Sequence, residues 1–234
     1  TGMSNLGVYN DGTFNMNGGS IVSNGLASVG IYSETGNTDT NLKGGSIRAE
    51  NGGIGLYAGN SSVMNLHEGL NLSSGNKGLL FYNYDNSTVS GKYDLTGAVG
   101  ASVENGGSAF YVKEGTSITD YLNNSFTGSG KLELTMDSGS KLYILEGTGT
   151  TLSLSSLDGM VNPGSSLTNN VIISSASASD YIPLSMNKGA LILDRNVNLD
   201  SSSELYKRSE FSSVKVDLTS GNSITGSQSD QTGI

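Results

Sequence analysis

The stretch Phe14-Asn15-Met16-Asn17-Gly18-Gly19-Ser20-Ile21 recurs one repeat later as Thr40-Asn41-Leu42-Lys43-Gly44-Gly45-Ser46-Ile47. A degraded third copy runs from Met64 to Leu72. In each copy apolar side chains alternate with polar ones around a glycine, which is the pattern of short β-strands with one buried face. Glycine and asparagine accept turn conformations with positive φ. The pattern therefore predicts short strands separated by tight turns.

Pairs of an apolar residue and a tyrosine form a second landmark with a similar period. They are Val8-Tyr9, Ile31-Tyr32, Leu56-Tyr57, Phe81-Tyr82 and Phe110-Tyr111, with tyrosine spacings of 23, 25, 25 and 29 residues. Two independent landmarks that share a period indicate an internal structural repeat. If the first residue of each pair points inward, the tyrosine points outward, and the five tyrosines form a column on one face.

Short strands at a fixed period, with no helix long enough to cross back over a sheet, predict an all-β parallel β-helix. One coil per roughly 24 residues gives about nine to ten coils for the 234-residue chain. Residues 1–115 form the regular part, and residues 116–234 continue the same solenoid less regularly, with insertions. Strands in that second part are predicted at 132–136, 142–145, 152–154, 171–173, 190–193, 197–199 and 214–218, and a short helix or turn at 201–211.

The composition excludes several classes of protein. Glycine, serine, asparagine and threonine make up about half of the chain, cysteine is absent, and the net charge is −9. No run of 18 apolar residues is present, so no transmembrane helix is predicted. Nucleic acids and anionic membranes select basic surfaces, so neither is an expected partner. This composition would permit a disordered chain. The recurrence of apolar residues at fixed positions in the repeat argues against disorder.

Three motifs carry a resemblance to a known family. They are Gly30-Ile31-Tyr32, the run from Asn41 to Ile47, and the run from Asn196-Val197-Asn198-Leu199-Asp200 through Tyr206-Lys207-Arg208. Together they resemble the passenger domains of large type Va autotransporter adhesins, in particular the giant ones of anaerobic oral Gram-negative bacteria. The resemblance covers most of the chain and implies a right-handed β-helix displayed outside the outer membrane. The terminal Thr232-Gly233-Ile234 looks like the start of another landmark, so we expect a fragment of a longer array.

The resemblance implies a cell-surface adhesin passenger segment on the extracellular face of the bacterial outer membrane. The expected partner is a receptor, protein or glycan, on a host cell or a partner bacterium. We expect a monomer that does not insert directly into the membrane and that holds neither cofactor nor metal. The absence of cysteine fits this route, because disulfides formed in the periplasm would hinder passage through a narrow pore.

Two alternatives are also compatible with the sequence. One is a polysaccharide-processing enzyme on a β-helix scaffold, and the other is a ligand-free stalk spacer. No two acidic residues are adjacent and no Asp-x-Asp occurs, so the sequence lacks the paired carboxylates of glycan cleavage. His67 is the only histidine, and the repeat explains it as an outward polar residue in the position of Asn17 and Lys43. The sequence therefore predicts no catalytic residues and favours a protein that is not an enzyme.

Two groups of residues are candidates for receptor contact. The favoured group is Tyr206, Lys207, Arg208 and Phe211, a concentration of aromatic and basic residues in an acidic chain, which is a composition typical of binding hot spots. The alternative group is the tyrosine column, Tyr9, Tyr32, Tyr57, Tyr82 and Tyr111. For the column we favour a structural role, in which stacked rings fix the register of the coils.

We predict that replacing Tyr206, Lys207 and Arg208 together by serine weakens receptor binding, because exposed tyrosine and arginine side chains carry much of the energy of typical interfaces. The β-sheet circular dichroism spectrum should stay unchanged. Binding to receptor-bearing cells measures the effect. Binding that survives the triple replacement and disappears when Tyr32 and Tyr57 are replaced would place the site on the tyrosine column instead.

Overall fold

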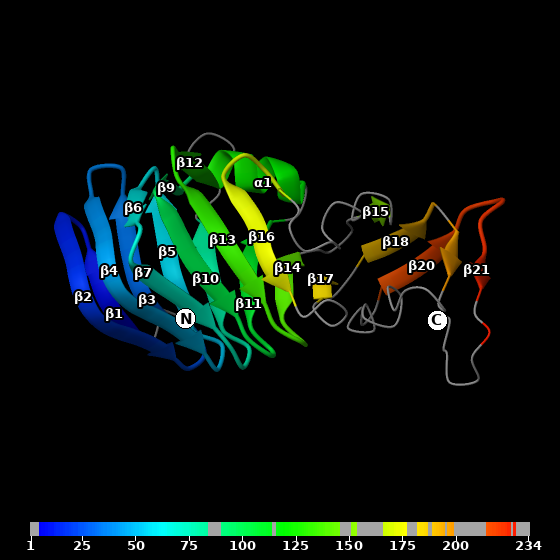
Figure 1. Ribbon diagram of the computed structural model, residues 1–234, viewed down its shortest axis with the longest axis horizontal. Coiled ribbons are helices and arrows are strands. Elements are labelled where there is room, and N and C mark those ends of the chain that lie inside the picture. Colours follow the sequence, from blue (N-terminus) through cyan, green and yellow to red (C-terminus); the bar gives the residue numbers. More distant parts are fainter. Residues whose placement is uncertain are drawn as a thin grey trace.

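The computed structural model describes residues 5–83, 90–113, 116–145, 151–153, 166–176, 182–186, 189–194, 196–198, 214–225 and 227. Over these residues the protein is all-β apart from one short helix, and its strands wind into a parallel β-helix, as the alternation predicts. Figure 1 shows the strands lying side by side along the long axis of the molecule. Every strand pairing within the sheets is parallel, because each turn of the chain lies on the preceding one in the same direction.

One wall of the solenoid is a seven-stranded sheet, which we call the tyrosine face. Its strands, in spatial order, are β1 (Asn5–Asn10), β3 (Ser28–Thr35), β5 (Ile54–Asn60), β8 (Leu79–Asn83), β11 (Ser108–Val112), β14 (Lys141–Leu145) and β17 (Ile182–Met186). The order follows the sequence, so each strand comes from a later turn of the chain than its neighbour. The apolar-tyrosine pairs of the sequence lie on β1, β3, β5, β8 and β11.

The other walls belong to a nine-stranded sheet. Its strands are β2 (Thr13–Asn24), β4 (Asp39–Glu50), β6 (Val63–His67), β7 (Leu70–Ser74), β9 (Lys92–Thr96), β10 (Ala98–Val103), β12 (Phe126–Gly128), β13 (Lys131–Met136) and β16 (Val171–Ala176). The two long strands β2 and β4 each span two walls, and their register shifts at the double glycines. Gly45, with φ of +97°, adopts a conformation that residues with side chains rarely take.

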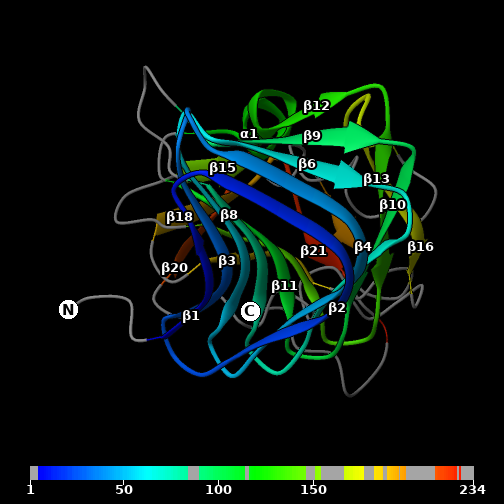
Figure 2. The same ribbon diagram turned by 90° about the vertical axis from the view of Figure 1, so that its left-hand side faces the viewer.

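The long strands divide this sheet into two faces. The first half of β4 pairs with β6, and the second half pairs with β7. We call the wall formed by the first halves of β2 and β4 with β6, β9 and β12 the asparagine face. The wall formed by their second halves with β7, β10, β13 and β16 is called the groove face. Figure 2 looks along the solenoid from the end that carries β1 and β2, and shows the later turns behind them.

The core is a narrow column of inward side chains stacked in register. On the asparagine face Met16 pairs with Leu42 and Leu42 with Leu66, and on the tyrosine face Ile31 pairs with Leu56. Leu42, Leu66, Ile31 and Leu56 are fully buried. Each is covered by its own coil and by the coils on either side, so one inward residue or two per strand suffice to exclude water.

An aromatic cluster lies in the core between β8 and β12. The rings of Phe81, Tyr93, Phe110 and Phe126 lie with centroids 5.0 to 5.7 Å apart. The buried Tyr93 hydroxyl donates to the carbonyl oxygens of Leu56 and Tyr82 at 3.1 and 2.9 Å, which satisfies its polar end. Burial raises the pKa of this phenol well above its ordinary value, so it stays neutral.

Insertions collect at the corner between the tyrosine face and the asparagine face. Asp11 and Gly12 alone separate β1 from β2, whereas residues 84–91 separate β8 from β9. The longer connection from β11 to β12 contains helix α1 (Ile118–Ser125), which lies outside the solenoid wall in Figure 2. Sequence reasoning did not predict this helix. The sequence feature that could have indicated the helix is its N-cap residue, Ser117. The Ser117 Oγ accepts a hydrogen bond from the Asp120 amide at 3.0 Å.

Shorter strands follow the two large sheets. A three-stranded parallel sheet contains β15 (Thr151–Ser153), β18 (Gly189–Leu193) and β20 (Val214–Leu218), and β19 (Val197–Asn198) pairs with β21 (Ile224–Thr225). In Figure 1 they lie beyond β16 and β17 along the long axis. Each strand predicted after residue 131 overlaps one of the observed strands. The segment 201–211, for which a short helix or turn is predicted, lies outside the described residues.

We predict that Leu42→Asp destabilises the protein by several kcal/mol, because an unpaired carboxylate would be buried between Met16 and Leu66. The damage should reach both neighbouring coils, since each supports the next. Thermal unfolding followed by circular dichroism measures the loss. Lys43→Asp is the matched control, because Lys43 is the exposed neighbour in the same strand. A Leu42→Asp variant that melts within about two degrees of the parent would contradict the assignment.

Candidate functional site

The five tyrosines of the sequence landmark form a continuous ladder of packed rings, which are tilted at three of the contacts and edge-to-face between Tyr57 and Tyr82. Ring centroids are 5.6 Å apart between Tyr9 and Tyr32, 4.7 Å between Tyr32 and Tyr57, 4.8 Å between Tyr57 and Tyr82, and 5.2 Å between Tyr82 and Tyr111. Aromatic pairs at these separations add about 0.5–1.5 kcal/mol each beyond the area that they bury. The ladder therefore contributes to holding neighbouring coils in register.

The ladder has a defined beginning and end in the described strands. At β1 the Tyr9 hydroxyl donates a hydrogen bond to a Glu34 carboxylate oxygen, and this bond raises the pKa of Tyr9 to about 12. At β14 the partner of Tyr111 is Ile144, and Tyr143 takes the inward position of Phe110. The landmark disappears from the sequence after Tyr111 because the tyrosine has moved from the outer to the inner side of the strand.

Two asparagine ladders occupy other edges of the solenoid. On the asparagine face the Asn41 amide donates to Asn15 Oδ1 at 3.1 Å, and the Asn65 amide donates to Asn41 Oδ1 at 2.9 Å. At the corner before the tyrosine face, Asn51 donates to Asn24 at 2.7 Å and Asn76 donates to Asn51. The amides of each ladder bond to one another from coil to coil. These ladders therefore stabilise the stack and leave few free groups for a ligand.

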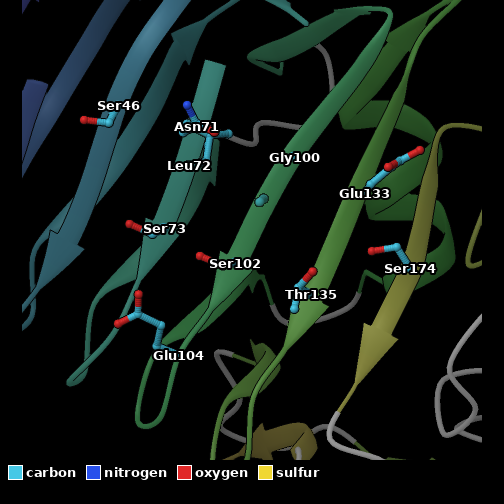
Figure 3. A pocket seen from close by; sticks show the side chains of 11 residues that line it. Ser46, Asn71, Leu72, Ser73, Gly100, Ser102, Glu104, Glu133, Thr135 and Ser174 are labelled. Carbon is cyan, nitrogen blue, oxygen red and sulfur yellow. The ribbon is translucent and has the colours of Figure 1, made fainter. Parts of the chain in front are cut away.

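The groove face differs, because it is hollowed. A groove of about 460 Å³ crosses β4, β7, β10, β13 and β16. Its lining residues are mostly small and polar: Ser46, Asn71, Leu72, Ser73, Gly100, Ala101, Ser102, Glu104, Glu133, Thr135 and Ser174. Figure 3 shows the polar side chains projecting from neighbouring strands, with Glu104 and Glu133 on opposite sides of the set.

Gly100 creates the hollow. The register places it in an outward row between Asn71 on β7 and Glu133 on β13. A Cβ atom at Gly100 would meet no heavy atom within 4 Å, so the missing side chain leaves open space above β10. The side chains of Asn71 and Glu133 stand on either side of this gap. The protein surface is therefore lower at Gly100 than at these two neighbouring positions.

One side of the groove is fixed by an ion-pair network that spans three strands. Arg48 on β4 binds both carboxylate oxygens of Glu104, just after β10, at 2.6 Å each, and Glu50 through its Nε at 2.6 Å. Nη1 of Arg48, one of the two nitrogens that bind Glu104, also donates to Ser73 Oγ at 3.3 Å on the intervening strand. The hydrogen bonds from Arg48 hold the pKa of Glu104 below its usual range, so this carboxylate stays ionised.

The middle and far side of the groove retain free hydrogen-bonding groups. The side chains of Asn71, Ser102 and Glu133 form no hydrogen bond or ion pair within the described part of the chain. Ser46, by contrast, donates to Ser20 at 3.0 Å, and Ser174 donates to the Leu134 carbonyl at 3.0 Å. An amide, a hydroxyl and a carboxylate are thus available together in one depression.

Other chemistry finds little support in the described residues. No three His, Asp or Glu side chains among them gather closely enough to bind a metal ion. His67 lies at the end of β6, paired in register with Thr96, in the outward position that the repeat predicts. The one helix of this part of the chain, α1, is too short to cross a membrane.

Of the two predicted groups of binding residues, the structure describes the tyrosine column and not the group around Tyr206. The tyrosine ladder is formed, and its rings gather on one face. Tyr206, Lys207, Arg208 and Phe211 lie outside the described residues, so their role in binding stays a prediction. The groove was missed by sequence reasoning. The sequence feature that could have indicated the groove is Gly100, within Ala98-Val99-Gly100-Ala101. That segment matches neither landmark, and the residues that lie beside Gly100 on neighbouring strands follow only from the strand register.

Comparison of the chain with protein-family models, with curated proteins and with solved structures found no match.

We predict that Glu104→Gln lowers stability at neutral pH by about 1 kcal/mol or less, as expected for a solvent-accessible ion pair. The pKa of Glu104 is depressed in the folded protein, so its contribution is present above the unfolded pKa and is lost as the pH falls through the folded value. Urea unfolding of parent and variant at pH 7 and at low pH measures this. The difference should disappear in acid.

Glu68→Gln is the control for this prediction, because Glu68 lies at the corner between β6 and β7 and joins no ion pair among the described residues. Its effect on stability at pH 7 should be smaller than that of Glu104→Gln. A Glu104→Gln difference that stays constant down to the lowest pH would show that the ion pair with Arg48 contributes nothing to stability.

Proposed function

We propose that this chain is a passenger segment of an autotransporter-type adhesin, displayed on the extracellular face of a bacterial outer membrane. It attaches to a receptor on a host cell or a partner bacterium. The solenoid is right-handed in this proposal, as parallel strand crossovers almost always are, and continues to nine or ten coils. The repeat and the parallel β-helix support the architecture, and the three motifs that resemble autotransporter passengers support the route to the cell surface.

One observation carries the adhesive part of the proposal. A rigid stack of coils presents an open polar groove in which Asn71, Ser102 and Glu133 have no partner among the described residues. On the asparagine face Asn15, Asn41 and Asn65 bond to one another, and on the tyrosine face the rings pack against one another. Free groups held in fixed positions by a stiff scaffold favour recognition of a partner, because little ordering entropy is lost on binding.

A polysaccharide-processing enzyme is the second candidate, because Glu104 and Glu133 line the same groove. Glycoside cleavage pairs a carboxylate with a carboxylic acid whose pKa is raised. Arg48 lowers the pKa of Glu104, so Glu104 is unsuited to donate a proton. We therefore favour binding over cleavage. Product release from a panel of polysaccharides that is lost in Glu133→Gln would overturn this preference.

The adhesive proposal predicts that the fluorescently labelled chain binds saturably to receptor-bearing host or bacterial cells, and that excess unlabelled chain competes. A bacterium that displays the parent segment should adhere more strongly than one from which these coils are deleted. An unrelated β-helix with the same number of coils, inserted in their place, is the control for length. Adherence that is fully restored by the unrelated coils would identify the segment as a spacer and contradict a binding role.

A further inference from the structure

We infer that the groove across β4, β7, β10, β13 and β16 binds an extended basic peptide segment of the receptor, with a lysine or arginine side chain against Glu133. The inference rests on the proposed function and names the class of ligand for it. The tyrosine ladder does not contribute to this surface.

The negative charge of the groove favours a cationic ligand. The lining contains two carboxylates, Glu104 and Glu133, and no cationic side chain. Arg48 beside the groove is already bound by two carboxylates, Glu50 and Glu104, so its positive charge is not available to a ligand. The whole chain carries a net charge of −9, which adds to attraction of cations over distance. An anionic ligand would meet repulsion from both sources, whereas an ammonium or guanidinium group would find Glu133 unpaired.

The dimensions and the neutral groups fit an extended chain. The groove crosses five neighbouring strands, which are about 4.8 Å apart, so it is roughly 19 Å long. An extended peptide of about six residues spans that length. The backbone groups of the central strands are already paired within the sheet. Recognition must therefore use side chains, and the Asn71 amide and Ser102 hydroxyl offer both donors and acceptors to peptide groups.

The open space at Gly100 determines where the ligand lies in the groove. Asn71, Gly100 and Glu133 follow one another across three strands, and the space without a side chain lies between the free amide and the free carboxylate. Figure 3 shows the gap at Gly100 flanked by these side chains. A ligand backbone that passes over Gly100 comes within reach of both neighbours. A side chain at position 100 would fill this space and force the ligand away from them.

The test uses the complete chain and a fluorescein-labelled hexapeptide of alternating lysine and serine, measured by fluorescence anisotropy at low salt. Gly100→Leu should weaken binding at least about tenfold, since it removes access to several hydrogen bonds at once. Gly18→Leu is the matched control, because a Cβ at Gly18 also meets nothing within 4 Å and Gly18 is not in the groove. The control should stay within about twofold of the parent.

Charge is tested separately. Glu133→Gln should weaken the lysine peptide about tenfold, the usual scale for a charge-assisted hydrogen bond, while Glu68→Gln should have little effect. A hexapeptide with glutamate in place of lysine should not bind. Equal affinities of the Gly100→Leu and Gly18→Leu variants, both with parental β-sheet spectra, would overturn the site. A neutral oligosaccharide that binds in a Gly100-dependent manner, where the lysine peptide does not, would overturn the ligand class.

The same variants separate this inference from the proposed function. Gly100→Leu protein that still binds receptor-bearing cells like the parent would refute the groove as the receptor site and leave the adhesive function standing. Parent protein that binds the lysine peptide through Gly100 and Glu133 but binds no cells would support the groove and refute adhesion.

Discussion

Stacking of identical strand positions from coil to coil is the constraint on which the rest of this structure depends. Each inward residue, such as Leu42 between Met16 and Leu66, is covered by its equivalents in the neighbouring coils. A single coil buries almost nothing by itself, so the apolar column is stable only as a stack. This is how a chain with 35% hydrophobic residues forms a continuous dry core.

The same register that aligns the inward residues also aligns the outward ones. It brings Tyr32 against Tyr57, Asn15 against Asn41 and Ser20 against Ser46, so that like side chains meet at these positions. Rings then pack against rings, and amides bond in series. At other positions unlike residues meet. Gly100 between Asn71 and Glu133 is one of these, and a groove lies there.

The ion pairs of the groove face also depend on the stacking of the coils. Arg48 reaches over β7 to Glu104, which is 56 residues away in sequence, because every second coil is close enough for a long side chain to bridge. The bridge anchors one side of the groove and keeps Glu104 ionised. Glu133 on the other side is left without a partner among the described residues, and this asymmetry gives the groove a defined polarity.

The sequence alone determined the parallel β-helix, the tyrosine column and the inward position of Leu42, because alternation and a fixed period depend only on local residue order. It also located the later strands at β13, β14, β16, β18 and β20. Only the tertiary structure decided helix α1, the inward turn of Tyr143, the Arg48–Glu104 pair and the hollow at Gly100. These depend on which residues of different coils face each other. Connections of unequal length, such as residues 84–91 between β8 and β9, change the sequence distance between residues that stack, so residue spacing alone does not reveal which residues meet.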